Sequence, residues 1–131
     1  MGLCPIIFNL KRMDKILKIE EIGQFILSIV LFSLLNYHWW IFPLLILTPD
    51  VSMVGYLINT KIGALLYNIF HHKFIAIMVM LGGFISNVNI FILIGLIMFG
   101  HSAMDRIFGY GLKYTDSFKH THLGWIGNNI K

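Results

Sequence analysis

Long apolar stretches interrupted by short polar breaks dominate the middle of this chain. Between residues 22 and 104, only Asp50, Lys61 and Lys73 belong to the charged Asp, Glu, Lys and Arg class. The uncharged runs before Asp50 and after Lys73 each exceed the roughly 20 residues that a helix needs to cross a bilayer. The pattern therefore predicts an all-α fold, a polytopic membrane helix bundle.

Polar and glycine-containing breaks divide the apolar region into four expected helices. The aromatic cluster at residues 37–40 has the composition of a membrane-interface belt. Further breaks fall at residues 59–61 and 86–87. The four expected transmembrane helices cover residues 20–36, 40–58, 62–84 and 88–108. The predicted organisation is a single membrane domain over 1–131, with a basic cytoplasmic N-terminal segment at 1–19, a four-span bundle at 20–108 and a cytoplasmic tail at 109–131.

Composition and charge also favour a membrane protein. Hydrophobic residues make up 57% of the chain and charged residues 12%, whereas soluble domains are about 25% charged. Most Lys and Arg residues lie before the first or after the fourth expected helix, so the positive-inside rule predicts an integral protein of the cytoplasmic (inner) membrane with both termini in the cytoplasm. The net charge of +4 is concentrated beside spans. We therefore expect membrane lipids, not nucleic acid, as partners.

Three ionisable residues inside the expected spans share one depth. Counted from the cytoplasmic ends of their helices, Asp50, His71 and His101 fall roughly 10–14 Å inside the boundary. Ionisable groups in hydrocarbon are costly and commonly mark functional sites. Asp105 follows His101 by four residues, so the two side chains share a helix face. Pro49 should kink the second helix where the Asp50 carboxylate lies.

Imidazole and carboxylate groups at one depth indicate a divalent-metal site, with zinc as the preferred ion. The candidate ligands are Asp50, His71, His101, Asp105 and, from the tail, His122. Other interpretations stay open, since Asp50 could cap a helix that restarts after Pro49 and a single buried His is commonly a hydrogen-bonded interior residue. His122 could close the site from below, or the tail could lie on the anionic leaflet.

Other residues of the spans are expected to shape the bundle around this site. Asn68 precedes His71 by three residues and should point into the bundle with it. Four glycines are expected to let helices approach closely rather than to line a site, namely Gly55, Gly63, Gly95 and Gly100.

Two functions follow from these residues. In the first, a metal with an open position lowers the pKa of bound water to about 7 and hydrolyses a lipid-like or phosphate ester. The catalytic residues are unknown at this point, with Tyr56 a candidate donor to the developing charge and Arg106, with Lys113, a candidate to neutralise an anionic head group. In the second, the same groups form a structural polar core or an ion or proton pathway. Four short spans leave little room for a transporter unless the chain forms a homo-oligomer.

Three segments of the chain resemble a known family. They are TPDVSMVGYLINTKIGALLYNIFHH (Thr48 to His72), GHSAMDRIFGYGLKY (Gly100 to Tyr114) and FKHTHLGWIG (Phe118 to Gly127). These segments resemble the hallmarks of the uncharacterised bacterial integral membrane family called domain of unknown function 4260. The resemblance covers about residues 17–127.

The resemblance implies a small integral membrane protein with a shared polar pattern. The matching positions here are Glu20, Asp50, Tyr56, Asn68, His71, His101, Asp105, Arg106, Tyr110, Lys113 and His122. The chain departs from the pattern at His72, where a small hydroxyl residue is common, and it lacks the proline expected soon afterwards. A second similarity, limited to Pro49, Asp50 and His71, is to membrane-bound metal-dependent hydrolase-like proteins.

Overall fold

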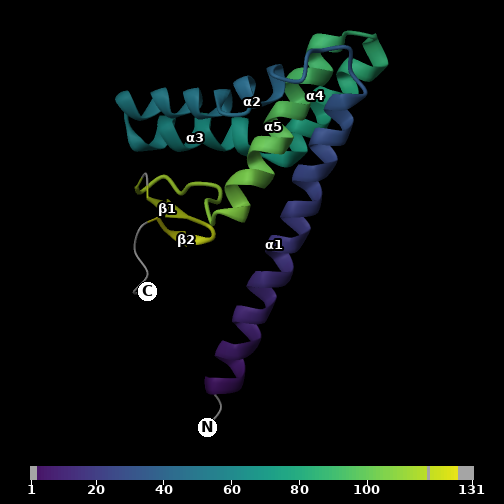
Figure 1. Ribbon diagram of the computed structural model, residues 1–131. Helices are drawn as coiled ribbons and strands as arrows, with labels where there is room; N and C mark the ends of the chain where they lie inside the picture. Colours follow the sequence, from purple (N-terminus) through teal and green to yellow (C-terminus); the bar gives the residue numbers. More distant parts are fainter. Residues whose placement is uncertain (1–2, 118, 127–131) are drawn as a thin grey trace.

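The computed structural model describes residues 3–117 and 119–126, which form a helical protein with a short hairpin near its end (Figure 1). The helices are α1 (Leu3–Ser33), α2 (Ile41–Leu45), the 3-10 helix η1 (Thr48–Leu57), α3 (Thr60–His71), α4 (Lys73–Ser86) and α5 (Asn89–Ile107). Strands β1 (His120–Thr121) and β2 (Gly124–Trp125) pair antiparallel. The helical fold class is confirmed, and the β1–β2 hairpin was not predicted.

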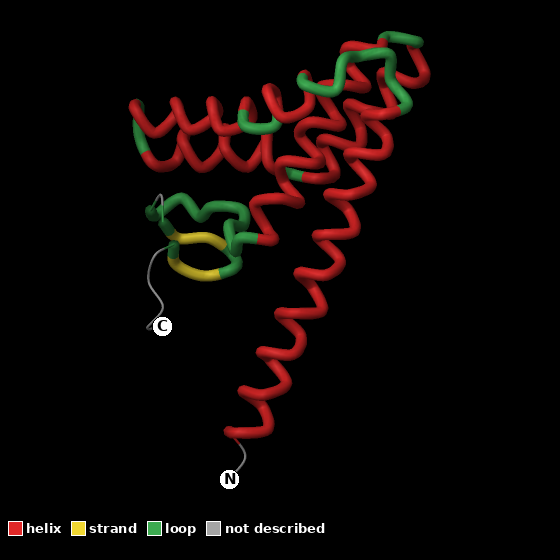
Figure 2. The backbone as a smooth tube through the Cα atoms, in the orientation of Figure 1, coloured by secondary structure: helices red, strands yellow, loops and turns green. Residues whose placement is uncertain are grey.

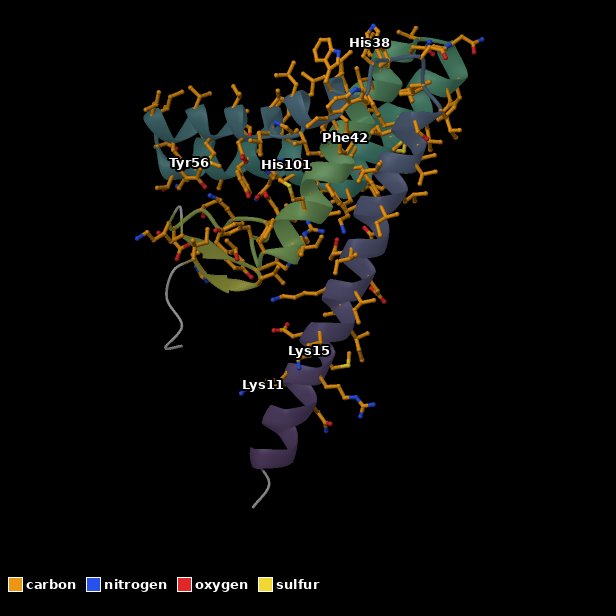
Figure 3. The ribbon with its side chains drawn as sticks, viewed as in Figure 1. Lys11, Lys15, His38, Phe42, Tyr56 and His101 are labelled. Atoms are coloured by element: carbon orange, nitrogen blue, oxygen red, sulfur yellow. The ribbon has the colours of Figure 1, made fainter. Side chains whose placement is uncertain are left out.

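Helix α1 is longer than the first expected helix. It runs unbroken for 31 residues and begins well before Glu20. Leu, Lys, Arg, Met and Glu are good helix formers, so the fall in hydropathy ahead of Glu20 does not end the helix. Lys11 and Lys15 lie on the part of α1 that extends beyond the other helices (Figure 3).

The second expected helix is interrupted. Helix α2 has five residues, and η1 begins at Thr48 after a short irregular segment (Figure 2). Pro49 occupies the first turn of η1. A proline is tolerated there because the first-turn N–H groups have no partner within the helix. The expected kink is therefore a break in front of Pro49, and the continuous helix over 40–58 was wrong.

Helix η1 presents three different faces, because a 3-10 helix has three residues per turn. The buried face consists of Pro49, Ser52 and Gly55. The outward face consists of Val51, Val54 and Leu57, all largely exposed. The third face, Asp50, Met53 and Tyr56, is partly buried. Asp50 and Tyr56 thus lie in line, two turns apart.

Glycines allow η1 and α3 to lie side by side across the direction of α1 (Figure 1). A Cβ added to Gly63 would lie 2.4 Å from the Tyr56 ring, and one added to Gly55 would lie 3.0 Å from the Gly63 Cα. Asn59 begins α3 by accepting a hydrogen bond from the Ile62 N–H. The expectation that these glycines permit close helix approach is confirmed.

The third expected helix is bent. Helices α3 and α4 meet at an angle of 51°, with His72 extended at the break. Because the His71 carbonyl accepts a hydrogen bond from the Ser102 hydroxyl at 2.9 Å, it has a partner outside its own helix. The single helix expected over 62–84 is therefore two helices that meet at this bend. Lys73, at the start of α4, donates to Glu21 and to Gln24 of α1.

Helices α4 and α5 form a tight antiparallel pair. Asn87 takes the left-handed conformation (φ 56°) that ends α4, and α5 closely matches the expected helix over 88–108. A Cβ on Gly95 would lie 2.6 Å from the Ala76 carbonyl oxygen and the Met80 nitrogen. The main core lies between α1, α2 and α5 and contains Phe32, Phe42, Ile46, Leu93, Leu96 and Ile97.

Within the described residues, α5 is the single unbent helix long and apolar enough to cross a membrane. The bent pair α3–α4 reaches the same length and hydropathy only when its two helices are taken together. Four such helices are thus not found among residues 3–117 and 119–126.

Candidate metal site

Four side chains with metal-ligand chemistry meet where η1, α3 and α5 come together. Asp50 belongs to η1, His71 to the end of α3, and His101 and Asp105 to successive turns of α5. Figure 3 shows His101 at this junction. One nitrogen or oxygen from each residue lies within 4.8 Å of the other three. We call these four residues the Asp–His cluster.

The four His–Asp distances of the Asp–His cluster are close to those between the ligands of one metal ion. His101 Nε2 lies 3.0 Å from Asp50 Oδ1 and 3.3 Å from Asp105 Oδ2. His71 Nε2 lies 3.4 and 3.3 Å from the same two oxygens. Bonds of about 2.0–2.2 Å to a tetrahedral zinc ion place its donors about 3.3–3.6 Å apart. All four donor atoms lie within 4.8 Å of one another, so one ion can contact them all after small side-chain adjustments.

Backbone carbonyls determine which ring nitrogens face the centre of the Asp–His cluster. His71 Nδ1 donates to the Tyr67 carbonyl at 2.8 Å, and His101 Nδ1 donates to the Ile46 carbonyl at 2.5 Å. A neutral imidazole then has a bare lone pair on Nε2. His101 Nε2 lies within hydrogen-bond distance of Asp50 Oδ1, whereas the buried His71 Nε2 has no hydrogen-bond partner among the described residues although both carboxylates lie within 3.4 Å of it. A proton on His101 or a metal ion between the four groups would relieve the repulsion between these lone pairs and the carboxylate oxygens.

Burial differs sharply within the Asp–His cluster. The side chains of His101 and His71 are 0% and 3% exposed, whereas those of Asp105 and Asp50 are 12% and 37% exposed. Both carboxylates line a cavity of about 240 Å³. The site is therefore closed on the imidazole side and open on the carboxylate side.

Residues 14–126 match one family model, which is described as Domain of unknown function (DUF4260). The chain belongs to the DUF4260 family. This confirms the family resemblance, and the matched range includes the whole Asp–His cluster. No curated protein and no solved structure matches the chain.

Tyr67 is the site residue of this DUF4260 protein that the sequence analysis missed. Its hydroxyl donates to Asp105 Oδ2 at 3.2 Å. Its ring stacks on His71 with centroids 3.7 Å apart and an interplanar angle of 12°. Tyr67 precedes His71 by four residues, the same spacing that revealed Asp105 beside His101. The four-residue spacing of Tyr67 and His71 was the signal in the sequence that could have identified Tyr67.

Replacing Tyr67 with phenylalanine should weaken metal binding by about 10- to 100-fold, the usual effect of losing an outer hydrogen bond to a ligand. The variant keeps the ring stack and the backbone carbonyl but loses the hydrogen bond to Asp105. Competition with a fluorescent zinc chelator measures the change. Tyr114→Phe, at an exposed ring in the tail, is the matched control. Equal affinity in both variants would contradict this role.

The tail of this DUF4260 protein turns back beneath the cluster at Gly109. Gly109 has a φ of 91°, which favours glycine, and the Tyr110 N–H donates to the Asp105 carbonyl at 2.8 Å. Asn68 then binds both backbone groups of Lys113, at 2.7 and 2.8 Å. Asn68 thus holds the tail, in addition to lying one turn from His71.

Loss of the Asn68 amide should loosen the tail locally. Two hydrogen bonds of about 0.5–1.5 kcal/mol each predict roughly 10- to 100-fold faster amide exchange in Asn68→Ala. Hydrogen–deuterium exchange of peptides covering residues 110–117 measures this. Asn36→Ala, at an exposed asparagine, should leave the same peptides unchanged. Unchanged exchange in Asn68→Ala would contradict the tether.

Lys113 places a buried cation beside the two carboxylates. It lines their cavity, and its Nζ lies 4.3 Å from the centre of the Tyr67 ring and 5.5 Å from that of Tyr56. Burial lowers the pKa of Lys113 to about 8, so the ammonium form predominates at neutral pH. The tertiary structure thus brings Tyr56 and Lys113 to the same side as Asp50.

Arg106 and His122 are not part of the Asp–His cluster. Both line a separate cavity of about 270 Å³ against α1. The His122 Nδ1 accepts a hydrogen bond from the Leu112 N–H at 2.8 Å, and its ring packs on Gly111. Partial burial and the nearby Arg106 lower the pKa of His122. The tail therefore does not bring the expected fifth ligand, His122, to the cluster, and Arg106 does not line the 240 Å³ cavity of the two carboxylates.

Proposed function

We propose that this DUF4260 protein binds a divalent metal ion, with zinc preferred, through Asp50, His71, His101 and Asp105. One observation carries the proposal: two histidines whose Nδ1 atoms donate to backbone carbonyls hold Nε2 within 3.4 Å of two carboxylate oxygens, and the buried Nε2 of His71 has no hydrogen-bond partner in the described part of the chain. Such outer-shell carbonyls are typical of metal-binding histidines, because they select the ring form that offers its lone pair.

Charge also supports a divalent ion. Two carboxylates offset a charge of +2, so the ion can be held beside almost fully buried rings without an unpaired charge. Imidazole with carboxylate ligation suits zinc and related first-row ions better than calcium or magnesium.

We further propose that the bound metal hydrolyses a lipid-like or phosphate ester. A metal-bound water has a pKa of about 7 and is nucleophilic at neutral pH. Asp50 is the most exposed member of the cluster and faces the cavity, so the metal could expand to five ligands on that side. Lys113 would neutralise an anionic group there, and Tyr56 is a candidate hydrogen-bond donor from the Asp50 face of η1.

We propose a membrane as the setting for this chemistry. Large hydrophobic side chains are exposed over much of the surface, including Val51, Val54 and Leu57 on η1, whereas soluble monomers rarely expose large contiguous apolar patches. In our arrangement α5 crosses the bilayer, the η1–α3 pair lies near the cytoplasmic boundary with that apolar face in lipid, and the tail lies on the water side. Homo-oligomer formation is a separate expectation.

A second candidate is a proton-holding polar core. The 3.0 Å separation of His101 Nε2 and Asp50 Oδ1 also suits a hydrogen bond when the imidazole is protonated. Protons could then occupy the positions that we assign to the metal, and the protein would be structural or part of a proton pathway.

Elemental analysis of the detergent-purified full chain, prepared without a histidine tag, separates these functions. We expect about one zinc ion, or one competing first-row metal, per chain after dialysis against excess metal and removal of the unbound fraction. Absence of metal after this reconstitution would overturn the metal proposal and leave the proton-holding core.

A further inference from the structure

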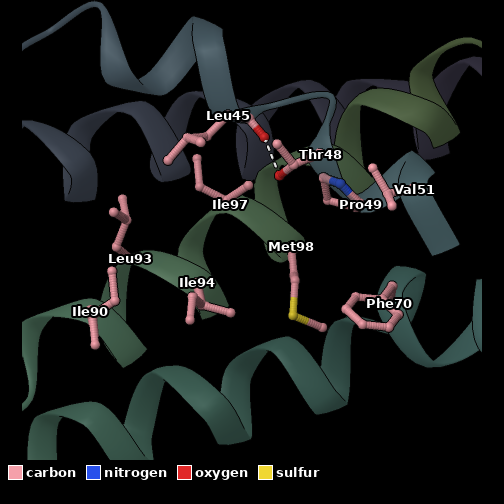
Figure 4. A pocket seen from close by; sticks show the side chains of 10 residues that line it. All are labelled: Leu45, Thr48, Pro49, Val51, Phe70, Ile90, Leu93, Ile94, Ile97 and Met98. Carbon is pink, nitrogen blue, oxygen red and sulfur yellow. Dashed lines mark hydrogen bonds between the residues drawn. The ribbon is translucent and has the colours of Figure 1, made fainter.

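A second, larger cavity is lined by residues next to the Asp–His cluster in the chain and by none of the residues that line the carboxylate cavity. Its volume is about 490 Å³, within the range of small-molecule sites. The lining side chains come from α2, η1, α3 and α5, and they converge on one space in Figure 4. Nine of its ten residues are apolar, and the Thr48 hydroxyl is already bonded to the Leu45 carbonyl. The cavity therefore offers no free polar group and suits a hydrocarbon chain.

The position of this apolar cavity connects it to the cluster. Pro49 and Val51, which line it, directly flank Asp50 in the chain. Phe70 precedes His71, and Met98 lies one turn before His101. Three of the four proposed ligands thus belong to backbone segments that also form the wall of the apolar cavity.

We propose that the apolar cavity holds the acyl chain of a single-chain lipid whose anionic head group reaches the Asp–His cluster. The assignment of the head group rests on the proposed metal binding, whereas that of the acyl chain does not. The substrate class is then a monoacyl lipid with a phosphate-like head group.

Charge complementarity specifies the head group. Without a metal and with neutral histidines, Asp50, Asp105 and Lys113 leave one net negative charge at the carboxylate cavity. A divalent ion changes this to one net positive charge, so an anionic head is attracted only by the metal-loaded site. The lining of the apolar cavity is uncharged, so we expect it to bind an acyl chain equally well in the metal-free and the metal-loaded protein.

The outer rim of the apolar cavity suits entry from lipid. Ile90 and Ile94 of α5, Phe70 of α3 and Val51 of η1 are all substantially exposed. A chain entering between these residues leaves the bilayer without crossing a polar surface, and it adds the burial of each methylene inside the cavity.

Native mass spectrometry of the full chain in detergent tests both halves separately. The metal-free protein is titrated with palmitoylglycerol, which has the chain but no charge. The zinc-loaded protein is titrated with palmitoyl lysophosphatidate, palmitoylglycerol and glycerol 3-phosphate, which has the head group but no chain. Ile94→Trp and Ile90→Trp fill the cavity at two partly exposed positions, so at least one should fold. Ile85→Trp, on α4 at a position 85% exposed and outside the cavity, is the matched control.

We expect one palmitoylglycerol per wild-type chain, binding about tenfold or more weaker in Ile94→Trp and Ile90→Trp, and wild-type binding in Ile85→Trp. Equal binding of palmitoylglycerol by all variants with normal helix content would overturn the acyl-chain assignment.

In the zinc-loaded protein, lysophosphatidate should bind more tightly than palmitoylglycerol, and Lys113→Gln should reduce that preference. If glycerol 3-phosphate binds as tightly as lysophosphatidate, the acyl chain adds nothing to binding and the ligand is not a lipid. If palmitoylglycerol binding is lost only in the two cavity variants and the protein binds no zinc, the acyl-chain site is supported and the metal site is rejected.

Discussion

Replacing His101 with alanine is expected to reduce bound zinc from about one ion per chain to almost none. His101 has no exposed side-chain surface, and its Nε2 lies within 3.3 Å of both carboxylates, so no other side chain or solvent group can readily take its place. Asp50→Ala should have the same effect because it removes the oxygen nearest to His101. Elemental analysis of each variant, with circular dichroism to verify helix content, measures the loss.

A matched histidine makes the His101 result specific. His120 lies in the tail, where its Nδ1 is 2.8 Å from an Asp116 oxygen, and His120→Ala should retain all of its zinc. Asp50→Asn separates the two candidate functions, because an amide preserves the side-chain shape but is a poor metal ligand. If the cluster binds metal, Asp50→Asn should lose its zinc. If the cluster is a proton-holding core, Asp50→Asn should leave the helix content and stability of the protein nearly unchanged. Full zinc content in both His101→Ala and Asp50→Ala would reject the site.

Gly95→Ala is expected to destabilise the protein strongly, because the added methyl group falls within the α4–α5 interface. The added Cβ would lie 2.6 Å from two backbone atoms of α4, the Ala76 oxygen and the Met80 nitrogen. Backbone cannot move aside as a flexible side chain can, so α4 and α5 must separate at a cost of about 1–3 kcal/mol or more. Denaturant titration in detergent micelles, followed by circular dichroism, measures the free energy of unfolding.

Gly82→Ala provides the control on the facing helix. No atom lies within 4 Å of a Cβ at Gly82, and alanine is the better helix former, so this variant should be neutral or up to about 1 kcal/mol more stable. If Gly95→Ala is as stable as Gly82→Ala, the close approach of α4 and α5 is not a major source of stability. Because α5 carries His101 and Asp105, we also expect weaker zinc binding in Gly95→Ala.

Local sequence patterns were sufficient where a helix is regular. The bounds of α5 follow from a long uncharged run and the polar pair at residues 86–87 before it, and the pairing of His101 with Asp105 follows from helical spacing. The meeting of Asp50, His71 and His101 was predicted from their shared depth, and the structure brings them together. Their expected depth in a bilayer stays a prediction.

Helix type could not be read from hydropathy. In an α-helix with 3.6 residues per turn, Asp50 and Tyr56 would point in different directions. The 3-10 geometry of η1 aligns them, and glycines at positions 55 and 63 let η1 pack closely on α3. Hydropathy indicates two consecutive apolar segments but not the number of residues per turn in either.

Composition, spacing and motifs are local properties of the chain, and they predicted the helical class, the family and five candidate ligands, of which the Asp–His cluster contains all but His122. Which atoms face one another depends on tertiary contacts. The carbonyls of Ile46 and Tyr67 select the ring nitrogens that point inward, and backbone groups leave no residue-specific mark in a sequence. Lys113 and His122 both follow the turn at Gly109, but only Lys113 lines the cavity of the two carboxylates. Hydrogen bonds between segments far apart in the chain, such as those of Asn68 with Lys113, determine where each side chain lies.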